Sequence, residues 1–348
     1  MSLHTVFVSG ATGFIGSHIV AQLLAAGHRV RGSVRNLRKS GDLAFLRRLP
    51  GAAERLELVE ADLLASHAFL GQLNGCDVVM HTASPYVLDV RDPQRDLVDP
   101  AVRGTRSMLE ACVDTAGIRR VVVTSSMAAV TDEPDAGHVL TEDDWNTRST
   151  LSRNPYYLSK TLAEREAWAF VDTHRPAWSL IAINPFLVLG PSLTKALNTS
   201  NKVIADLLNG VYPAIPALTW GLVDVRDAAG AHIRAMDAEG ARGRYICAAD
   251  VITLRRVVEL LRANGYSRYR LPRIGLDHPI GNVLAKLAAY GQSKGARQYL
   301  QTHLGRVPRF DNSKIRRDLT MTFRPLEATV VETAADLVRW GHASPRRA

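Results

Sequence analysis

Three glycines near the start of the chain constrain its fold more than any other feature. Gly10, Gly13 and Gly16 are spaced three apart, between the apolar run "TVFVS" and the helix-period segment "GSHIVAQLLAAG". Glycine permits a sharp turn and lets backbone N–H groups approach a phosphate, while the N-terminus of the following helix adds positive potential. The spacing is one residue looser than G-x-G-x-x-G, but the physics is the same. We predict that a dinucleotide cofactor binds at Gly10, Thr12, Gly13, Phe14, Ile15 and Gly16, with its pyrophosphate against the glycine turn.

Strands and helices alternate through the first 190 residues. Apolar runs typical of buried strands occupy residues 5–10, 28–35, 55–62, 76–84, 119–126 and 178–185, and helix-period segments occupy 101–117 and 157–174. Continuous apolar strands separated by helices indicate a parallel sheet with helices on both faces. Right-handed crossovers bring the carboxyl ends of the strands to one edge, where ligands bind. We therefore expect an α/β fold with a Rossmann doubly wound parallel sheet.

The pattern changes after Asn184. Loops rich in Pro and Gly, with one short helix, give way to a strand and helix over 222–236 and a strand at 243–250. Helices follow at 252–264, near 283–289 and over 326–340. We predict a dinucleotide-binding domain of residues 1–184, to which 223–240 return, and a smaller mixed α/β C-terminal lobe that binds the substrate (185–222 and 241–348).

Composition excludes several classes of function. The chain is 46% hydrophobic and 22% charged, as in ordinary globular proteins, and no apolar run reaches the roughly 20 residues that span a bilayer. The net charge of +9 comes mostly from residues after Arg255, where basic residues are dispersed, so we expect no nucleic-acid partner and no membrane. Cys76, Cys112 and Cys247 are too scattered for a disulfide framework or a metal site, and no targeting segment precedes the first strand. We expect buried, reduced thiols and a cytoplasmic location.

The end of the second strand favours NADP over NAD. NAD enzymes commonly place Asp or Glu here to bind the ribose hydroxyls. Residues 29–36 contain no acid, and Arg35 follows Val34. An acid would repel a 2′-phosphate, whereas a guanidinium binds it in a bidentate manner. We predict NADP(H) with Arg35 as the phosphate ligand and Ser33, Arg38 and Lys39 as helpers; the alternative is that Arg35 is a surface cation.

Residues after the third and fourth strands complete the predicted cofactor site. Asp62 and Leu63 follow the third strand, in a position to meet the adenine. The small residues Thr82, Ala83 and Ser84 follow the fourth, where they would let the backbone pass close to the pyrophosphate and ribose. The alternative is that these are ordinary loop residues.

Tyr156 and Lys160 lie four residues apart in a helical segment, so they share one face of it. An ammonium group stabilises a phenolate and lowers the tyrosine pKa from about 10, which would make Tyr156 a proton donor. Ser125 and Ser126 end the fifth strand, where a hydroxyl can polarise a carbonyl. The Tyr–Lys spacing alone is common, but together with the glycine loop and the serine pair it predicts an acid catalyst. Tyr157 has the wrong offset to Lys160 and is expected to pack or to line the pocket.

These motifs resemble the extended short-chain dehydrogenases/reductases, and within them the dihydroflavonol 4-reductase / cinnamoyl-CoA reductase-like subgroup, which includes microbial aldehyde and ketone reductases. The resemblance covers nearly the whole chain, in segments such as "VSGATGFIGSHI", "HTASP", "RRVVVTSS", "YYLSKTLAEREAW", "INPFLVLGP" and "VDVRDAAGAHI". It implies that Ser126, Tyr156 and Lys160 are catalytic, that Lys160 holds the nicotinamide ribose, and that Pro185 and Val188 lie beside the nicotinamide. It also implies a substrate bound between the two lobes.

This sequence differs from related enzymes at three points, and each difference argues against one mechanism or substrate. Ala101 stands where many related enzymes have Asn, so an Asn-based proton relay is not expected. The segment after "TSS" differs from that of plant flavonoid reductases, which argues against a flavonoid substrate. Asp132 and Glu133 come too late to be the acid pair of a sugar-nucleotide dehydratase.

We therefore expect an NADPH-dependent carbonyl reductase, or alcohol dehydrogenase, that interconverts a ketone or aldehyde and an alcohol. The alternatives are a hydroxysteroid dehydrogenase, a nucleotide-sugar epimerase, a reductase of coenzyme A thioesters, or an NADP-sensing protein without catalysis. Either a monomer or a homodimer would fit. An aromatic or aliphatic carbonyl compound is expected in a mostly apolar pocket made of the loop from Ser84 to Val87, Tyr157, Phe186, Leu187, Pro191, Tyr212, Ile215 and Trp220.

Overall fold

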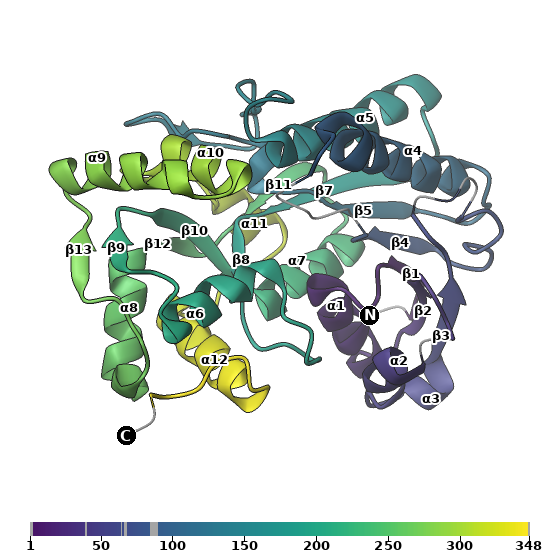
Figure 1. Cartoon of the computed structure of the whole chain (residues 1–348). Coiled ribbons are helices and arrows are strands. Elements are labelled where there is room, and N and C mark those ends of the chain that lie inside the picture. The colour runs from purple at the N-terminus through teal and green to yellow at the C-terminus, as the bar shows by residue number, and fades with distance from the viewer. Residues whose placement is uncertain (1–2, 39, 64, 66–67, 84–89, 347–348) are drawn as a thin grey trace.

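A computed structural model describes residues 3–38, 40–63, 65, 68–83 and 90–346. A large sheet and its helices form one part of the molecule, and smaller sheets with the C-terminal helices form the other (Figure 1). None of the helices among the described residues combines the length and the apolar composition that crossing a membrane requires.

The large sheet has seven parallel strands in the order β11-β7-β5-β4-β1-β2-β3. This order confirms the predicted doubly wound α/β fold, and it reverses direction between β1 and β4, which is where such sheets bind ligands. The strands are β1 (Thr5–Ser9), β2 (Arg29–Val34), β3 (Leu56–Glu60), β4 (Val78–His81), β5 (Arg120–Thr124), β7 (Ser179–Pro185) and β11 (Gly243–Cys247).

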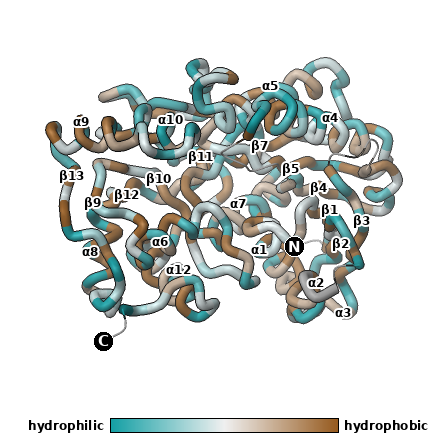
Figure 2. Tube along the Cα trace, in the orientation of Figure 1, coloured by the Kyte–Doolittle hydropathy of each residue, from teal (hydrophilic) through white to brown (hydrophobic). Residues whose placement is uncertain are grey.

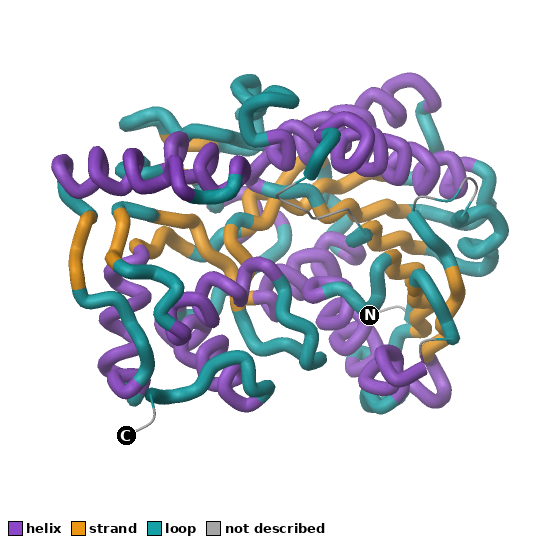
Figure 3. Tube along the Cα trace, in the orientation of Figure 1, coloured by secondary structure: helices purple, strands orange, loops and turns teal. Residues whose placement is uncertain are grey.

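Helices cover both faces of this sheet (Figure 3). Figure 1 shows α4 (Asp99–Val113) and α5 (Pro155–His174) above it and α1 (Phe14–Ala25) and α7 (Val225–Asp237) below it. Side chains alternate between the two faces, so Val6 and Val8 join one hydrophobic core and Phe7 joins the other. Because both faces of the sheet are covered, its strands are continuous apolar runs in the sequence. Figure 2 shows polar residues along the outer side of α5, which faces away from the sheet.

The first half of the chain contains further short elements beside the large sheet. They are α2 (Ser40–Arg47), α3 (Ala52–Arg55), a π-helical turn η1 (Gln94–Val98), a 3-10 turn η2 (Met127–Ala129) and β6 (Val139–Leu140).

The smaller part of the molecule has its own hydrophobic core, which contains Ile204, Leu222, Val258 and Val330. Its strands are β8 (Leu187–Leu189), β9 (Ala214–Pro216), β10 (Thr219–Asp224), β12 (Asp250–Thr253), β13 (Ile274–Leu276) and β14 (Arg309–Phe310). Its helices are α6 (Thr199–Asn209), α8 (Leu254–Ala263), η3 (Tyr266–Arg268), α9 (Pro279–Ala288), η4 (Ala289–Gly291), α10 (Lys294–His303) and α12 (Leu326–Arg339). Helix α11 (Ser313–Asp318) instead packs against β11, and its Ile315 joins the same core as Val6 and Val8 of the large sheet.

The structure corrects the sequence-based expectation for β11 and adds helix α10. The sequence predicts that the strand at 243–250 belongs to the smaller lobe, but β11 pairs with β7 in the large sheet. The reason is that α7 packs against α1 below the sheet and so returns the chain to the edge beside β7. Helix α10 was not predicted, because "KGARQYLQTH" is mostly polar. The division into two domains otherwise remains a prediction.

Candidate active site

The glycine loop lies at the centre of the sheet, between β1 and α1. Gly10 has a φ of +68°, and a Cβ on it would lie 3.1 Å from Cα of Ala83. A Cβ on Gly16 would lie 2.3 Å from the carbonyl oxygen of Gly10. The first position requires a left-handed backbone and the second leaves no room for a side chain, so glycine is needed at both.

The N-terminus of α1 follows directly. Gly13 is its N-cap and has no side chain that could accept hydrogen bonds from the first-turn N–H groups. Thr12 and Gly13 are exposed, whereas Phe14 and Ile15 are half-buried against the core. This exposed helix end is a suitable place for an anion.

The loop after β4 is hydrogen-bonded to the end of β1. Ser9 Oγ accepts from the N–H groups of Thr82 (3.0 Å) and Ala83 (3.1 Å), and Thr82 Oγ1 donates to the Ser9 carbonyl (2.6 Å). Ser9 Oγ also lies 2.8 Å from Nδ1 of His81. Burial, with a smaller contribution from the charge of Lys160, lowers the pKa of His81 to about 4. The structure thus brings Thr82 and Ala83 against the glycine loop. Two parts of the predicted site lie outside the described residues: the loop from Ser84 to Val87, and Lys39.

The residues predicted to distinguish NADP from NAD lie at the ends of β2 and β3. Arg35 is exposed immediately after β2. Ser33 is buried, and its Oγ accepts a 3.3 Å hydrogen bond from the Gly10 N–H. Asp62 is exposed, and Leu63 packs so closely on α4 that a Cβ at Gly104 would lie 2.6 Å from it. All of these residues lie at the carboxyl edge of the sheet.

The three predicted catalytic residues lie on two elements that pack together. Ser126 follows β5, and its Oγ accepts a 3.2 Å hydrogen bond from the Ala128 N–H. Tyr156 and Lys160 lie in the first two turns of α5, with Lys160 Nζ 5.9 Å from the centre of the Tyr156 ring. Thr161 Oγ1 donates to the Ala128 carbonyl (3.2 Å), which joins the turn after Ser126 to α5. Lys160 is 9% exposed, and burial lowers its pKa to about 8.

The start of α5 is attached to the smaller lobe. Asn154 adopts a left-handed conformation (φ 47°), and its Nδ2 donates to Asp132 Oδ1 and, across 3.2 Å, to Thr302 Oγ1. Its backbone N–H donates to Gln298 Oε1 (3.3 Å). Thr302 and Gln298 belong to α10, so this helix meets the end of α5 that carries Tyr156.

Two residues of α10 connect two of the predicted pocket residues. His303 Nε2 lies 3.2 Å from the hydroxyl of Tyr157, and the His303 ring stacks on Tyr299 at 4.2 Å. Trp220 Nε1 donates to the Tyr299 hydroxyl (2.6 Å). Sequence reasoning missed Tyr299 and His303, which stand four apart in a polar segment without a recognisable motif.

The remaining predicted pocket residues are spread through the hydrophobic cores. Phe186 is buried, with its ring 4.9 Å from that of Phe310. Leu187 and Tyr212 are half-buried against the core of the smaller lobe, and Ile215 lies within it. The carbonyl of Pro191, the last of these pocket residues, lies 2.9 Å from His18 Nε2. Of the two residues predicted to lie beside the nicotinamide, Pro185 ends β7 and Val188 pairs with Val223 of β10.

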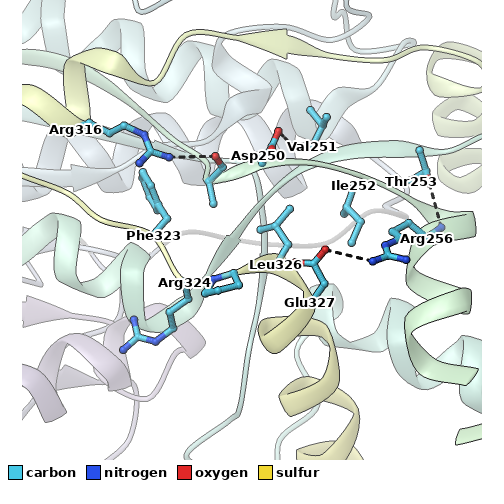
Figure 4. A pocket seen from close by; sticks show the side chains of 12 residues that line it. Asp250, Val251, Ile252, Thr253, Arg256, Arg316, Phe323, Arg324, Leu326 and Glu327 are labelled. Carbon is cyan, nitrogen blue, oxygen red and sulfur yellow. Dashed lines mark hydrogen bonds and ion pairs between the residues drawn. The ribbon is translucent and has the colours of Figure 1, made fainter. Parts of the chain in front are cut away.

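A groove of about 450 Å³ lies between the β11–β12 connection and the start of α12 (Figure 4). Arg316 and Arg256 stand on opposite sides of it, the first 3.5 Å from the Ala249 carbonyl and the second 3.6 Å from Glu327. None of the predicted site residues is among the described residues that line this groove.

A sequence profile of the NAD dependent epimerase/dehydratase family matches residues 6–249, more than half of the chain. The chain belongs to this family. The resemblance to the extended short-chain dehydrogenases/reductases is therefore confirmed.

Relatives named as reductases match almost the full length. A cinnamoyl-CoA reductase of Medicago truncatula is 36% identical over 341 residues, 96% of this chain and 95% of its own length. A tetraketide alpha-pyrone reductase of Arabidopsis thaliana is 35% identical over 347 residues, 97% of each chain. The crystal structure of yeast methylglyoxal/isovaleraldehyde reductase complexed with NADPH superimposes with a TM-score of 0.80 at 31% identity, covering 97% of this chain and 99% of that one. The predicted class, an oxidoreductase of this family, is confirmed.

Proposed function

We propose that the chain is an NADPH-dependent carbonyl reductase that interconverts a ketone or aldehyde and an alcohol. The observation that supports this most is the buried Lys160 beside Tyr156, on a helix that packs against the turn carrying Ser126. All three residues lie at the carboxyl edge of the sheet that carries the glycine loop. A phenol, an ammonium and a hydroxyl at this edge form a site for proton transfer to a carbonyl oxygen.

The residues present fit an NADP(H) molecule. Gly10 and Gly16 stand where a Cβ would clash, so the turn that they form has no side chains at these positions. The exposed N-terminus of α1 would bind the pyrophosphate. Arg35 would bind the 2′-phosphate, Asp62 and Leu63 would meet the adenine, and Thr82, Ala83, Pro185 and Val188 would contact the rest of the cofactor. The yeast relative, whose structure is complexed with NADPH, supports NADP(H) as the cofactor. When bound, the reduced nicotinamide supplies the hydride.

Three side chains of the protein carry out the proton transfer. The Ser126 hydroxyl donates a hydrogen bond to the substrate carbonyl oxygen and polarises it. Tyr156 gives its phenolic proton to this oxygen as negative charge develops there, which leaves a phenolate. The ammonium of Lys160 stabilises that phenolate, and so lowers the Tyr156 pKa, and also holds the nicotinamide ribose. Because the pKa of Lys160 is lowered only to about 8, the group remains mostly charged at neutral pH.

The substrate is proposed to be an aromatic or aliphatic carbonyl compound. Tyr157, Trp220, Tyr299 and His303 form a continuous aromatic group beside the start of α5. A coenzyme A thioester is the second candidate, because a cinnamoyl-CoA reductase is similar over nearly the whole chain.

The three cysteines support the predicted cytoplasmic location. Cys76, Cys112 and Cys247 are all buried and free. Burial raises the pKa of the Cys76 thiol to about 11 and raises those of the other two further. Protonated, buried thiols resist oxidation and suit a reducing compartment.

The test is the rate of NADPH oxidation, with NADH in parallel, against aromatic aldehydes, aliphatic ketones, diketones, ketosteroids and an aromatic acyl-CoA. We expect turnover of at least one class and a preference for NADPH. Tyr156→Phe, which keeps the ring and removes the proton donor, should lower kcat by about 100-fold or more with NADPH affinity unchanged. Equal activity of Tyr156→Phe, or no turnover of any class by the wild type, would count against the proposal.

A further inference from the structure

One buried carboxylate joins α5 to three neighbouring strands. Glu164 lies one turn after Lys160 on the same face of α5 and is 3% exposed. Its Oε2 accepts hydrogen bonds from Ser125 Oγ (2.5 Å) and Asn184 Nδ2 (2.7 Å), and its Oε1 accepts one from Arg244 Nε (2.6 Å). Ser125 follows β5, Asn184 lies in β7 and Arg244 lies in β11.

The donors that bind Glu164 also hold the turn that carries Ser126. Asn184 Nδ2 donates to the Ser126 carbonyl (3.2 Å), and Ser125 is the adjacent residue. Arg244 Nη2 donates to the Ala129 carbonyl (3.3 Å) at the end of the same turn. The position of Ser126 relative to α5 therefore depends on the network around Glu164.

Arg244, the partner of Glu164, is also buried. It is 7% exposed, stacks 3.8 Å from the centre of the Trp145 ring, and donates to the carbonyls of Glu142 (2.8 Å) and Asp144 (2.5 Å). A buried ion pair has a large desolvation cost, so its presence is weak support for a role in stability alone. Its location one turn from Lys160 suggests a role in the reaction.

We propose that Glu164 and Arg244 are positioning residues that hold Ser126 against α5 and keep the surroundings of Lys160 and Tyr156 electrically neutral. The proposal rests on the proposed function only in taking Tyr156 as the proton donor. Glu164 lies two helical turns from Tyr156, roughly 12 Å along the axis of α5, and charges in a buried site interact more strongly than in water. An unpaired charge at Glu164 or Arg244 should therefore shift the pKa of Tyr156 by on the order of one unit.

The other titratable groups near Glu164 and Arg244 are either neutral or paired with partners that the test does not substitute. His81 on β4 is neutral, because burial lowers its pKa to about 4. His303 on α10, which faces Tyr157, is neutral for the same reason. The carboxylates nearby have partners of their own: Asp132 with Arg153, Glu133 with Arg306, Glu142 with the Ile246 N–H, and Asp144 with His138.

The test titrates Tyr156 directly. For each variant, the phenolate absorbance is measured against pH and compared with the same variant carrying Tyr156→Phe, so the difference isolates one tyrosine. Glu164→Gln leaves the Arg244 cation unpaired, which favours the phenolate and should lower the Tyr156 pKa. Arg244→Met leaves the Glu164 carboxylate without its cationic partner, which disfavours the phenolate and should raise the Tyr156 pKa.

The double variant Glu164→Gln/Arg244→Met removes both charges. Its Tyr156 pKa should return to the wild-type value, while kcat stays reduced because the Ser126 turn has lost its hydrogen bonds. Arg244→Lys, which keeps the charge but not the geometry, should show the same combination. Asp77→Asn, which alters a carboxylate bonded to Thr5 and His4 at the opposite edge of the sheet, is the matched control and should change neither quantity.

Opposite shifts in the two single variants support the proposal, because a purely structural pair would lower stability in both without opposite effects on one phenol. Shifts of the same sign, or no shift in variants that stay folded and bind NADPH, overturn it. The titration needs no substrate. If the wild type has no reductase activity, the proposed function is contradicted, but the titration of Tyr156 can still be interpreted.

Discussion

The hydroxyl of Tyr157 lies 3.2 Å from Nε2 of His303, and this hydrogen bond connects α5 to the smaller lobe. On its other side the His303 ring is held by α10 itself, because Nδ1 lies 2.8 Å from Thr302 Oγ1 and 3.2 Å from the Tyr299 carbonyl. The residue next to the proposed acid is thereby held by the lobe proposed to bind the substrate.

Breaking this hydrogen bond should affect the substrate more than the cofactor. We expect Tyr157→Phe and His303→Ala each to raise KM for the carbonyl substrate roughly two- to tenfold, the range of one neutral hydrogen bond. The Kd for NADPH should not change. Steady-state kinetics with cofactor titration checks this, and the double variant should be little worse than either single one. Fully additive effects would show that the two residues act independently.

Arg35 should determine the choice between the two cofactors. Arg35→Ala should weaken NADPH binding roughly tenfold or more, the loss of a charge-assisted contact, with little effect on NADH. Arg35→Lys should retain part of the preference, because an ammonium keeps the charge but not the bidentate geometry. Arg29→Ala, which removes an exposed cation at the opposite end of β2, serves as the control. An equal loss in that variant would show that general surface charge, and not a contact of Arg35, sets the affinity for NADPH.

Gly16 should tolerate no side chain. Gly16→Ala places a Cβ 2.3 Å from the Gly10 carbonyl oxygen, and we expect it to lower the free energy of unfolding by about 1–3 kcal/mol and to weaken NADPH binding. Gly240→Ala is the control, since a Cβ there meets nothing within 4 Å. Chemical denaturation and cofactor titration measure both effects. A Gly16→Ala protein with normal cofactor affinity would argue against the glycine loop as the pyrophosphate site.

Acid should destabilise the protein through buried histidines. Burial lowers the pKa of His81, His232 and His303 from 6.5 to about 4. The unfolded chain therefore binds more protons, and the stability from these neutral rings is complete above pH 6.5 and lost as pH falls toward 4. His232→Asn, outside the proposed site, should lower the Tm at neutral pH and make the fall in Tm between these pH values shallower. An unchanged slope would mean that other groups cause the acid sensitivity.

Local patterns in the sequence predict much of the fold and part of the site. The glycine spacing from Gly10 to Gly16 and the helical offset of Tyr156 and Lys160 are short-range features, so they are readable without the structure. Glu164 and Arg244 are not, because their pairing depends on β11 joining the large sheet beside β7. Tyr299 and His303 acquire their place only when α10 meets α5. Long-range packing of polar residues leaves no periodic signal for sequence reasoning to detect.

The separate core of the smaller lobe has an evolutionary consequence. Residues such as Ile204, Leu222 and Val258 pack among themselves and not with the cores on either side of the large sheet. Substitutions there can change the shape of one lobe while the glycine loop and the start of α5 keep their geometry. A lineage of such chains can therefore diversify its substrates by drift in one core and inherit its chemistry unchanged in the others.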